Sequence, residues 1–170
     1  MTYKQKFLID SNVFINAKYF HYNFNYCKIF WDYLIDLHAN GIVYTINSVK
    51  RELLAKPDEI SSWINNEVPP SFFLDEMSSM ANYAKLMNWS QSLDVVEKAK
   101  EDFASQTKAD AFLIAHAMTH NFAIITHERS QPGAKKRIMI PNAADAHGVR
   151  TLTIFEFLST HSGQNFTCLP

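Results

Sequence analysis

Short apolar runs alternate with longer segments of helical spacing along this chain. Runs rich in β-branched and aromatic residues predict five strands, at Lys6–Asp10, Ile42–Ile46, Phe122–Thr126, Arg137–Pro141 and Arg150–Ile154. Four of these runs are almost continuously apolar, which is typical of strands covered on both faces. Strands separated by helices favour crossover connections. The pattern therefore predicts an α/β fold with a central, mainly parallel sheet flanked by helices.

The segments between these runs carry apolar residues three and four positions apart. The first predicted helix presents one face made of Phe24, Cys27, Trp31, Leu34, Ile35 and His38, and ends near Gly41. A short helix carrying Val49, Leu53 and Leu54 is expected to begin at a cap on Asn47 or Ser48 and to stop before Pro57. Several helical segments follow over residues 58–121, and the last runs from Lys108 to His120.

The chain shows no linker, repeat or low-complexity stretch, so we expect one domain over residues 1–170, with a core over about 6–158. A content of 47% apolar residues suits a sizeable core. The polar loop Glu128–Lys136 is the best candidate for a mobile segment, and we expect a loosely held C-terminal tail over 159–170.

Composition excludes several classes of site. The four glycines lie far apart, so neither a P-loop nor a dinucleotide-binding loop is present. Two distant cysteines exclude a disulfide framework and a thiolate zinc site, and fit a reducing compartment. The chain lacks a secretory-signal pattern and an apolar run of the ~18 residues that a membrane span needs, so we expect a cytoplasmic protein without a membrane partner. With 16 basic and 17 acidic residues, any polyanion must be met by a local patch.

Acidic side chains follow the predicted strands. Ligands of open parallel sheets bind beyond the carboxyl ends of the strands. Asp10 ends the first strand, Glu52 lies one turn into the helix after the second, and Glu128 follows the third. Asp110 lies in the first turn of the helix that leads into the third strand, and this helix start faces the same edge if the Thr107 region caps it. Four acids are thus expected to converge.

Crowded carboxylates repel one another unless a cation is present, and oxygen ligands suit one or two Mg²⁺ or Mn²⁺ ions. Such ions can activate a water and stabilise the leaving oxygen of a phosphodiester. Each acid also has an ordinary interpretation: Asp10 as a turn or cap residue, Glu52 as a solvated helix residue, and Asp110 as a first-turn acid. Asp110 is the more unusual because it begins a small, apolar run where a buried acid needs a partner.

Four segments carry a resemblance to the PIN-domain nucleases. They are Phe7-Leu8-Ile9-Asp10-Ser11-Asn12, Ser48-Val49-Lys50-Arg51-Glu52-Leu53, Lys108-Ala109-Asp110-Ala111-Phe112-Leu113-Ile114-Ala115-His116-Ala117 and Ile124-Ile125-Thr126-His127-Glu128. They occur in the family's order over about residues 6–158. The closing Ile140-Pro141-Asn142, Gly148-Val149 and Phe155-Glu156-Phe157-Leu158 are similar to bacterial PIN proteins of the VapC-like and uncharacterised DUF4411 types.

The resemblance implies a three-layer PIN-like fold and a metal-dependent endoribonuclease. Asp10, Glu52 and Asp110 match the family's three core metal-binding acids, and Glu128 stands where the fourth is often Asp. Supporting polar roles fall to Ser11, Asn12, Thr126 and His127. Bacterial relatives are often toxins that cut RNA and are inhibited by an antitoxin protein, and many form homodimers. The alternative is a non-catalytic PIN-like module that binds RNA or protein. A phosphatase of the haloacid dehalogenase type needs a second Asp where Asn12 stands, which disfavours it.

Three further groups have two interpretations each. The basic cluster of Arg129, Lys135, Lys136 and Arg137 either contacts RNA phosphates or is a solvated surface. The aromatic cluster within Tyr19–Tyr26 is either core or dimer face, or a base-stacking surface. His116 and His120 have a zinc-compatible spacing, but the intervening residues lack a zincin's catalytic Glu, which favours core packing and a helix-end position.

Overall fold

The computed structural model describes residues 4–169 and has a five-stranded parallel sheet at its centre. The strands are β1 (Phe7–Ile9), β2 (Val43–Ile46), β3 (Phe73–Leu74), β4 (Ala123–Ile125) and β5 (Thr151–Leu152). They are arranged in the order β3-β2-β1-β4-β5, and every neighbouring pair is parallel. The predicted α/β class is confirmed.

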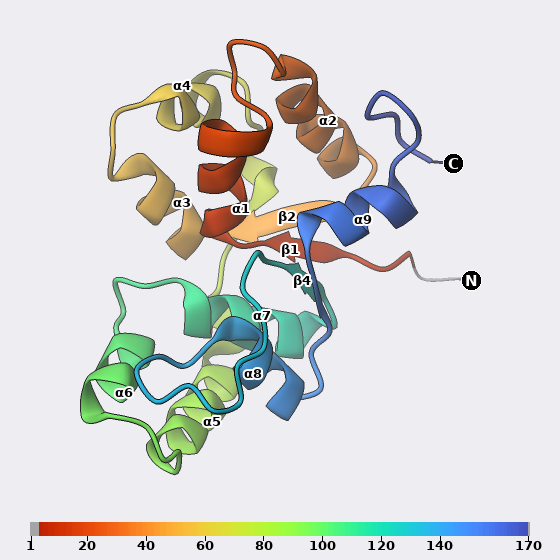
Figure 1. Cartoon of the computed structure of the whole chain (residues 1–170). Helices are drawn as coiled ribbons and strands as arrows, with labels where there is room; N and C mark the ends of the chain where they lie inside the picture. The colour runs from red at the N-terminus through yellow and green to blue at the C-terminus, as the bar shows by residue number, and fades with distance from the viewer. Residues whose placement is uncertain (1–3, 170) are drawn as a thin grey trace.

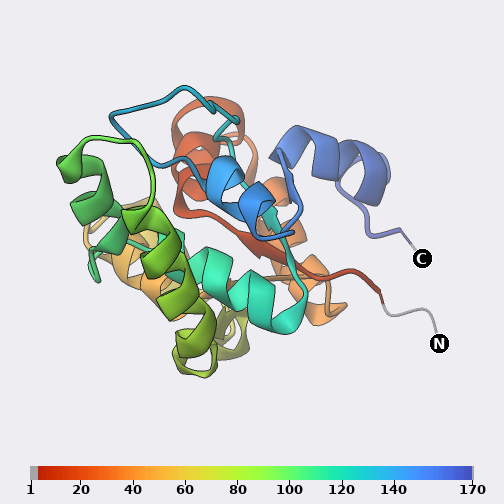
Figure 2. The same cartoon turned by 90° about the horizontal axis from the view of Figure 1, so that it is seen from below.

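Helices cover both faces of the sheet (Figure 1). One layer contains α1 (Ser11–Asn16), the π-helical turn Ala17–His21, α2 (Lys28–Ala39), α3 (Asn47–Leu54), α4 (Glu59–Asn66) and α9 (Ile154–His161). The other layer contains α5 (Met80–Gln91), α6 (Glu97–Ala104), α7 (Asp110–His120) and α8 (Ile140–Ala146), several of which lie in front of the sheet in Figure 2. Single 3₁₀ turns occupy Pro70–Phe72 and Met77–Ser79. These three layers are consistent with a PIN-like fold.

The central strand β1 shows why the sheet forms at this point in the sequence. Phe7, Leu8 and Ile9 have no exposed surface, because β1 pairs with β2 on one side and β4 on the other and is covered by both helical layers. The ring of Phe7 packs edge-on against Phe157 of α9, with centroids 5.0 Å apart. Burial of each such side chain contributes about 2 kcal/mol to stability.

One predicted strand is wrong. Residues 137–139 are irregular, and Ile140 and Pro141 begin α8. Pro141 lies in the first turn, where its missing N–H needs no helical partner. Ile138 and Ile140 are buried by tertiary packing, so their hydrophobicity does not report strand pairing.

The fifth strand of the sheet is β3, which the sequence pattern does not predict. Its two residues, Phe73 and Leu74, pair with Thr45 and Ile46 at the end of β2. A strand of two residues is too short to show the alternation by which strands are recognised. The strand therefore forms because β2 offers a free edge there.

Helix starts also differ from the expectation. α2 begins at Lys28, so Phe24 and Cys27 precede it, although Phe24 still stacks on Trp31 at 4.0 Å between centroids. Gly41, with φ of 71°, follows its end as predicted. Ile46 rather than Asn47 or Ser48 holds the cap position of α3, and no side chain caps it.

The C-terminal segment packs on the fold rather than hanging loosely as the sequence predicted. α9 extends to His161, and Ser162 forms a β-bridge with Cys168. The ring of Phe166 lies 5.5 to 5.9 Å from those of Tyr22, Phe30 and Tyr33. This single aromatic anchor explains the difference. Within residues 4–169, no helix has both the length and the apolar character that crossing a membrane requires.

Candidate functional site

Asp10 occupies the carboxyl end of the central strand and is almost completely buried. Its exposed fraction is 1%, and its backbone N–H donates to the carbonyl of Ile125 at 3.0 Å. The hydroxyl of Thr126 donates to Oδ2 at 2.9 Å, and that of Ser11 lies 3.4 Å from Oδ1. Asp10 precedes α1 but makes no side-chain cap bond to it, so a capping role does not account for this carboxylate.

Burial raises the pKa of Asp10 to about 7. The neighbouring Asp110 adds to this rise, and Glu128 and Glu52 contribute further, whereas the hydrogen bond from Thr126 lowers the pKa. The four acids predicted from the sequence therefore lie close enough to act on one another. Asp10 is the one among them that holds its proton near neutral pH in the absence of a cation.

Glu52 and Asp110 meet where α3 approaches the start of α7. Oε1 of Glu52 accepts a hydrogen bond from the backbone N–H of Ala109 at 2.8 Å, and Asp110 is the first residue of α7. Glu52 thus satisfies one of the unpaired N–H groups at this helix end, which the Thr107 region was expected to do. The side chain of Asp110 is 18% exposed, so it borders on solvent.

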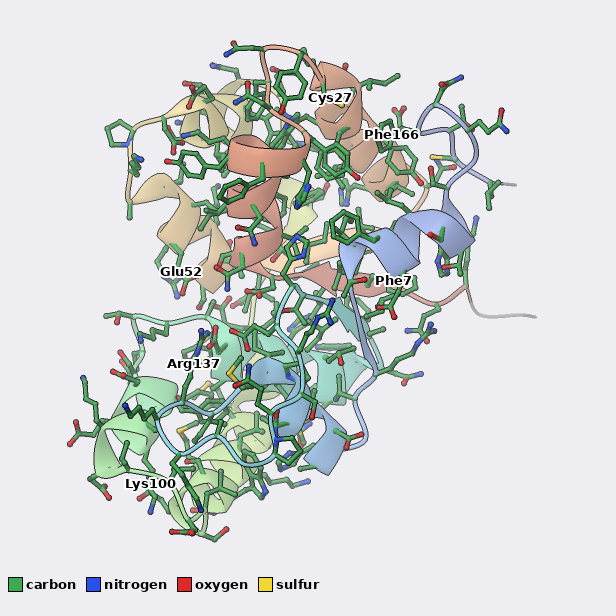
Figure 3. All side chains as sticks on the ribbon, viewed as in Figure 1. Phe7, Cys27, Glu52, Lys100, Arg137 and Phe166 are labelled. Carbon is green, nitrogen blue, oxygen red and sulfur yellow. The ribbon has the colours of Figure 1, made fainter. Side chains whose placement is uncertain are left out.

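Glu128 is held from two sides. Its Oε2 accepts the backbone N–H of Ile140 at 2.7 Å, and its Oε1 forms a close ion pair with Arg137. The same Nη2 atom of Arg137 lies 3.4 Å from Oδ2 of Asp110. Burial raises the pKa of Glu128, and the Ile140 hydrogen bond opposes that rise. Figure 3 shows Glu52 and Arg137 at the same end of the sheet, opposite the start of β1.

The chemistry of these donors fits a hard divalent cation. A buried carboxylate whose ionisation is opposed by three neighbouring acids is the group that a cation would relieve. In the present geometry, no three His, Cys, Asp or Glu side chains within residues 4–169 are grouped closely enough to hold a metal ion. Two of the acids are instead bridged by Arg137, and Glu52 is engaged by Ala109.

The chain matches the family described as "Domain of unknown function (DUF4411)" over residues 7–165. The chain belongs to this family. No curated protein and no solved structure matches it. Membership of the DUF4411 family assigns no activity, so the function has to be argued from the geometry of the site.

The other residues predicted for the site have varied positions. Asn12 is half-buried in α1. The half-buried ring of His127 packs among aromatic rings, 5.5 Å from Phe155 and 6.1 Å from His21, and burial lowers its pKa. The position of His127 indicates packing rather than a contact with Asp10.

The basic cluster is divided between two environments. Lys135 forms a close ion pair with Asp94, and Arg137 bridges the two acids. Arg129 and Lys136 are exposed. Two of the four cations are thus committed to carboxylates, and two face solvent.

One acid at this edge has no counterpart among the sequence candidates. Glu76 follows β3 and is 5% exposed. Its Oε1 lies in close contact with the Ser48 hydroxyl and 3.3 Å from Nη2 of Arg51, while Oε2 has no hydrogen-bond partner. Recognising Glu76 would have required recognising β3, and a two-residue strand carries no such signal.

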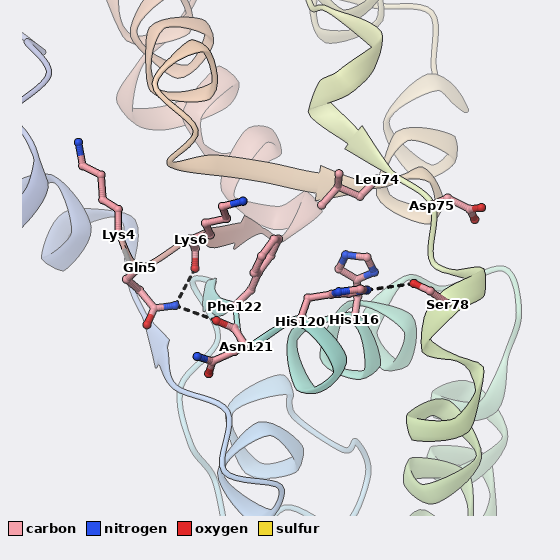
Figure 4. Close-up of a pocket in the computed structure, with 10 residues that line it drawn as sticks. All are labelled: Lys4, Gln5, Lys6, Leu74, Asp75, Ser78, His116, His120, Asn121 and Phe122. Carbon is pink, nitrogen blue, oxygen red and sulfur yellow. Dashed lines mark hydrogen bonds between the residues drawn. The ribbon is translucent and has the colours of Figure 1, made fainter. Parts of the chain in front are cut away.

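His116 and His120 lie apart from these acids, beside a cavity of about 590 Å³ (Figure 4). Their rings are 4.4 Å apart, and they contact the hydroxyls of Ser79 and Ser78 at 3.2 and 3.0 Å. His116 is buried, which lowers its pKa to about 4 and keeps the ring neutral. Their positions agree with core packing for His116 and a helix end for His120.

Proposed function

We propose that this protein is a metal-dependent endoribonuclease whose site consists of Asp10, Glu52, Asp110 and Glu128. The observation that carries the proposal is the buried carboxylate of Asp10 at the end of β1, surrounded by three further acids. Burying an acid in such company lowers stability, and a fold keeps it when a ligand compensates. The order of the motifs along the chain supports PIN-type RNA cleavage as the chemistry.

Mg²⁺ or Mn²⁺, as one or two ions, would supply activation of a water and neutralisation of charge at the phosphodiester. Thr126 and Ser11 orient the carboxylate of Asp10 through their hydroxyls. Glu128 is fixed by the backbone of Ile140, and Glu52 by that of Ala109. These contacts hold the acids in place before any ligand arrives, which is the pre-organisation that catalysis requires.

The test is cleavage of a labelled single-stranded RNA in Mn²⁺ or Mg²⁺ and in EDTA. We expect cleavage that EDTA abolishes and that Asp10→Asn and Asp110→Asn each reduce by at least about a hundredfold. Asp145→Asn is the matched control, because Asp145 makes the same change of side chain on the exposed part of α8. Undiminished cleavage in EDTA or by Asp10→Asn protein would exclude this function.

The alternative function is a non-catalytic module that binds RNA or protein. It is favoured by one observation, the engagement of Asp110 and Glu128 by Arg137, which makes the acids partners of an internal cation. Tight RNA binding that is independent of metal, without cleavage in any divalent ion, would support this alternative.

We extend the proposal to the biological setting that the PIN resemblance implies. The protein would act in the cytoplasm as the toxin of a toxin–antitoxin pair, as a monomer or homodimer. Expression in a bacterial host should then arrest growth. Asp10→Asn should relieve the arrest, and so should co-expression of the neighbouring gene product. Growth unaffected by the wild-type protein would contradict the toxin role alone.

A further inference from the structure

Arg137 places a permanent positive charge inside the candidate site. Its guanidinium contacts both Asp110, at 3.4 Å, and Glu128, more closely. A guanidinium stays protonated at every pH of interest. The two acids that it bridges are among the four proposed to hold the divalent cation. One internal cation therefore occupies ligands that the proposed function assigns to another.

The backbone on both sides of Arg137 is fixed. Two residues before it, the carbonyl of Lys135 accepts the N–H of Val96 at 2.9 Å. The next residue, Ile138, is buried at 5% exposure, and Ile140 is bonded to Glu128. The loop therefore delivers the guanidinium to this place, and only the side chain of Arg137 is free to change position.

The side chain of Arg137 is 53% exposed, whereas that of Glu128 is 6% exposed. The arginine can consequently move into water at little desolvation cost, while Glu128 needs a positive partner wherever it is ionised. A divalent ion can supply that partner with twice the charge. Leaving the site is thus easy for the cation that the protein carries and costly for the acid.

We propose that Arg137 is a built-in competitor of the divalent cation: it neutralises Asp110 and Glu128 in the metal-free protein and leaves them when the metal binds. The inference rests on the proposed metal-dependent function. Since the guanidinium remains tethered beside the site after its release, it then presents its charge to the phosphates of the bound RNA.

The test is the affinity for Mn²⁺, measured by isothermal titration calorimetry on the full chain without RNA. A competitor lowers the apparent affinity by the fraction of time it occupies the ligands. We expect Arg137→Gln to bind Mn²⁺ about tenfold more tightly than wild type, equivalent to about 1.4 kcal/mol. Arg129→Gln is the matched control: it removes the same charge from an exposed position in the same loop and should leave the affinity unchanged.

Thermal unfolding gives an independent readout. In EDTA the Arg137→Gln protein should melt about 2–4 °C below wild type, because Asp110 and Glu128 lose their counter-charge, and saturating Mn²⁺ should remove that deficit. If Arg137→Gln does not fold, Arg137→Lys replaces it, with a smaller gain in affinity. In the wild-type protein, the Nε–H resonance of Arg137 should move toward that of a solvated arginine during a Mg²⁺ titration.

Two outcomes overturn the inference and are distinguishable. If wild type binds Mn²⁺ and cleaves RNA but Arg137→Gln binds Mn²⁺ equally or more weakly, the inference fails and the proposed function stands. If neither protein binds Mn²⁺ and wild type does not cleave RNA, both fail together.

Discussion

Replacing Asp10 by Asn should stabilise the metal-free protein at neutral pH. The carboxyl of Asp10 has a pKa of about 7 in the folded chain and of 3.8 in its absence of perturbation, mainly because it is buried. Above pH 7 the folded state must hold an ionised acid that burial and its neighbours disfavour. Three pKa units correspond to about 4 kcal/mol of lost stability. Asparagine carries no charge, and its carbonyl can still accept the hydroxyl of Thr126.

The sign of the effect makes it dependent on pH. Because the folded-state pKa is raised, the penalty is absent below about pH 4, grows as the unfolded chain ionises, and is complete above about pH 7. The advantage of Asp10→Asn over wild type should therefore rise from about 2 kcal/mol at pH 5 to about 4 kcal/mol at pH 8.

Urea denaturation in EDTA at pH 5 and pH 8, followed by tryptophan fluorescence, measures both differences. Asp145→Asn, on the exposed part of α8, should show no difference that grows with pH. Adding Mn²⁺ should stabilise wild type far more than Asp10→Asn. An Asp10→Asn protein that is less stable than wild type at pH 8, or an advantage equal at both pH values, would refute the reasoning.

Three further predictions concern the same site and one buried ion pair. Mn²⁺ affinity should fall about tenfold per pH unit below pH 7, because binding must displace the proton of Asp10; calorimetry in buffers of different ionisation enthalpy should detect that proton, and an affinity flat from pH 5 to 8 would contradict this. Thr126→Val removes a hydrogen bond that lowers the pKa of Asp10, so the same affinity profile should move to higher pH, whereas an unmoved profile would show that the bond is immaterial. Lys18 is 6% exposed and lies 2.8 Å from Asp58, so Lys18→Met should cost about 3 kcal/mol in urea denaturation. Lys98→Met, which breaks an exposed pair, should cost under about 0.5 kcal/mol, and equal costs would refute the burial argument.

The fold class and four of the strands could be predicted from local pattern alone. β1 and β4 are buried on both faces, so their sequences are continuously apolar, and that signal does not depend on the rest of the chain. The same reasoning located Asp10 and Glu128, because a residue that follows a parallel strand lies at the edge where ligands bind. These positions depend on chain order, which the sequence contains in full.

The local pattern failed where residues far apart in the chain determine the structure. Ile138 and Ile140 are apolar because they pack into the core beside α8, and nothing in their local sequence separates this from strand pairing. β3 forms because β2 leaves an edge for Phe73 and Leu74, and Glu76 lies at the carboxyl edge only as a consequence.

Arg137 is the clearest case of a property that only the tertiary structure decides. From the sequence it belongs to a basic cluster open to RNA phosphates. In the folded chain it lies against Asp110, 27 positions away, and Glu128, 9 positions away. The sequence determines which charges the protein carries and which of them follow strands. Whether two opposite charges neutralise each other depends on distance and burial, which exist only once the chain has folded.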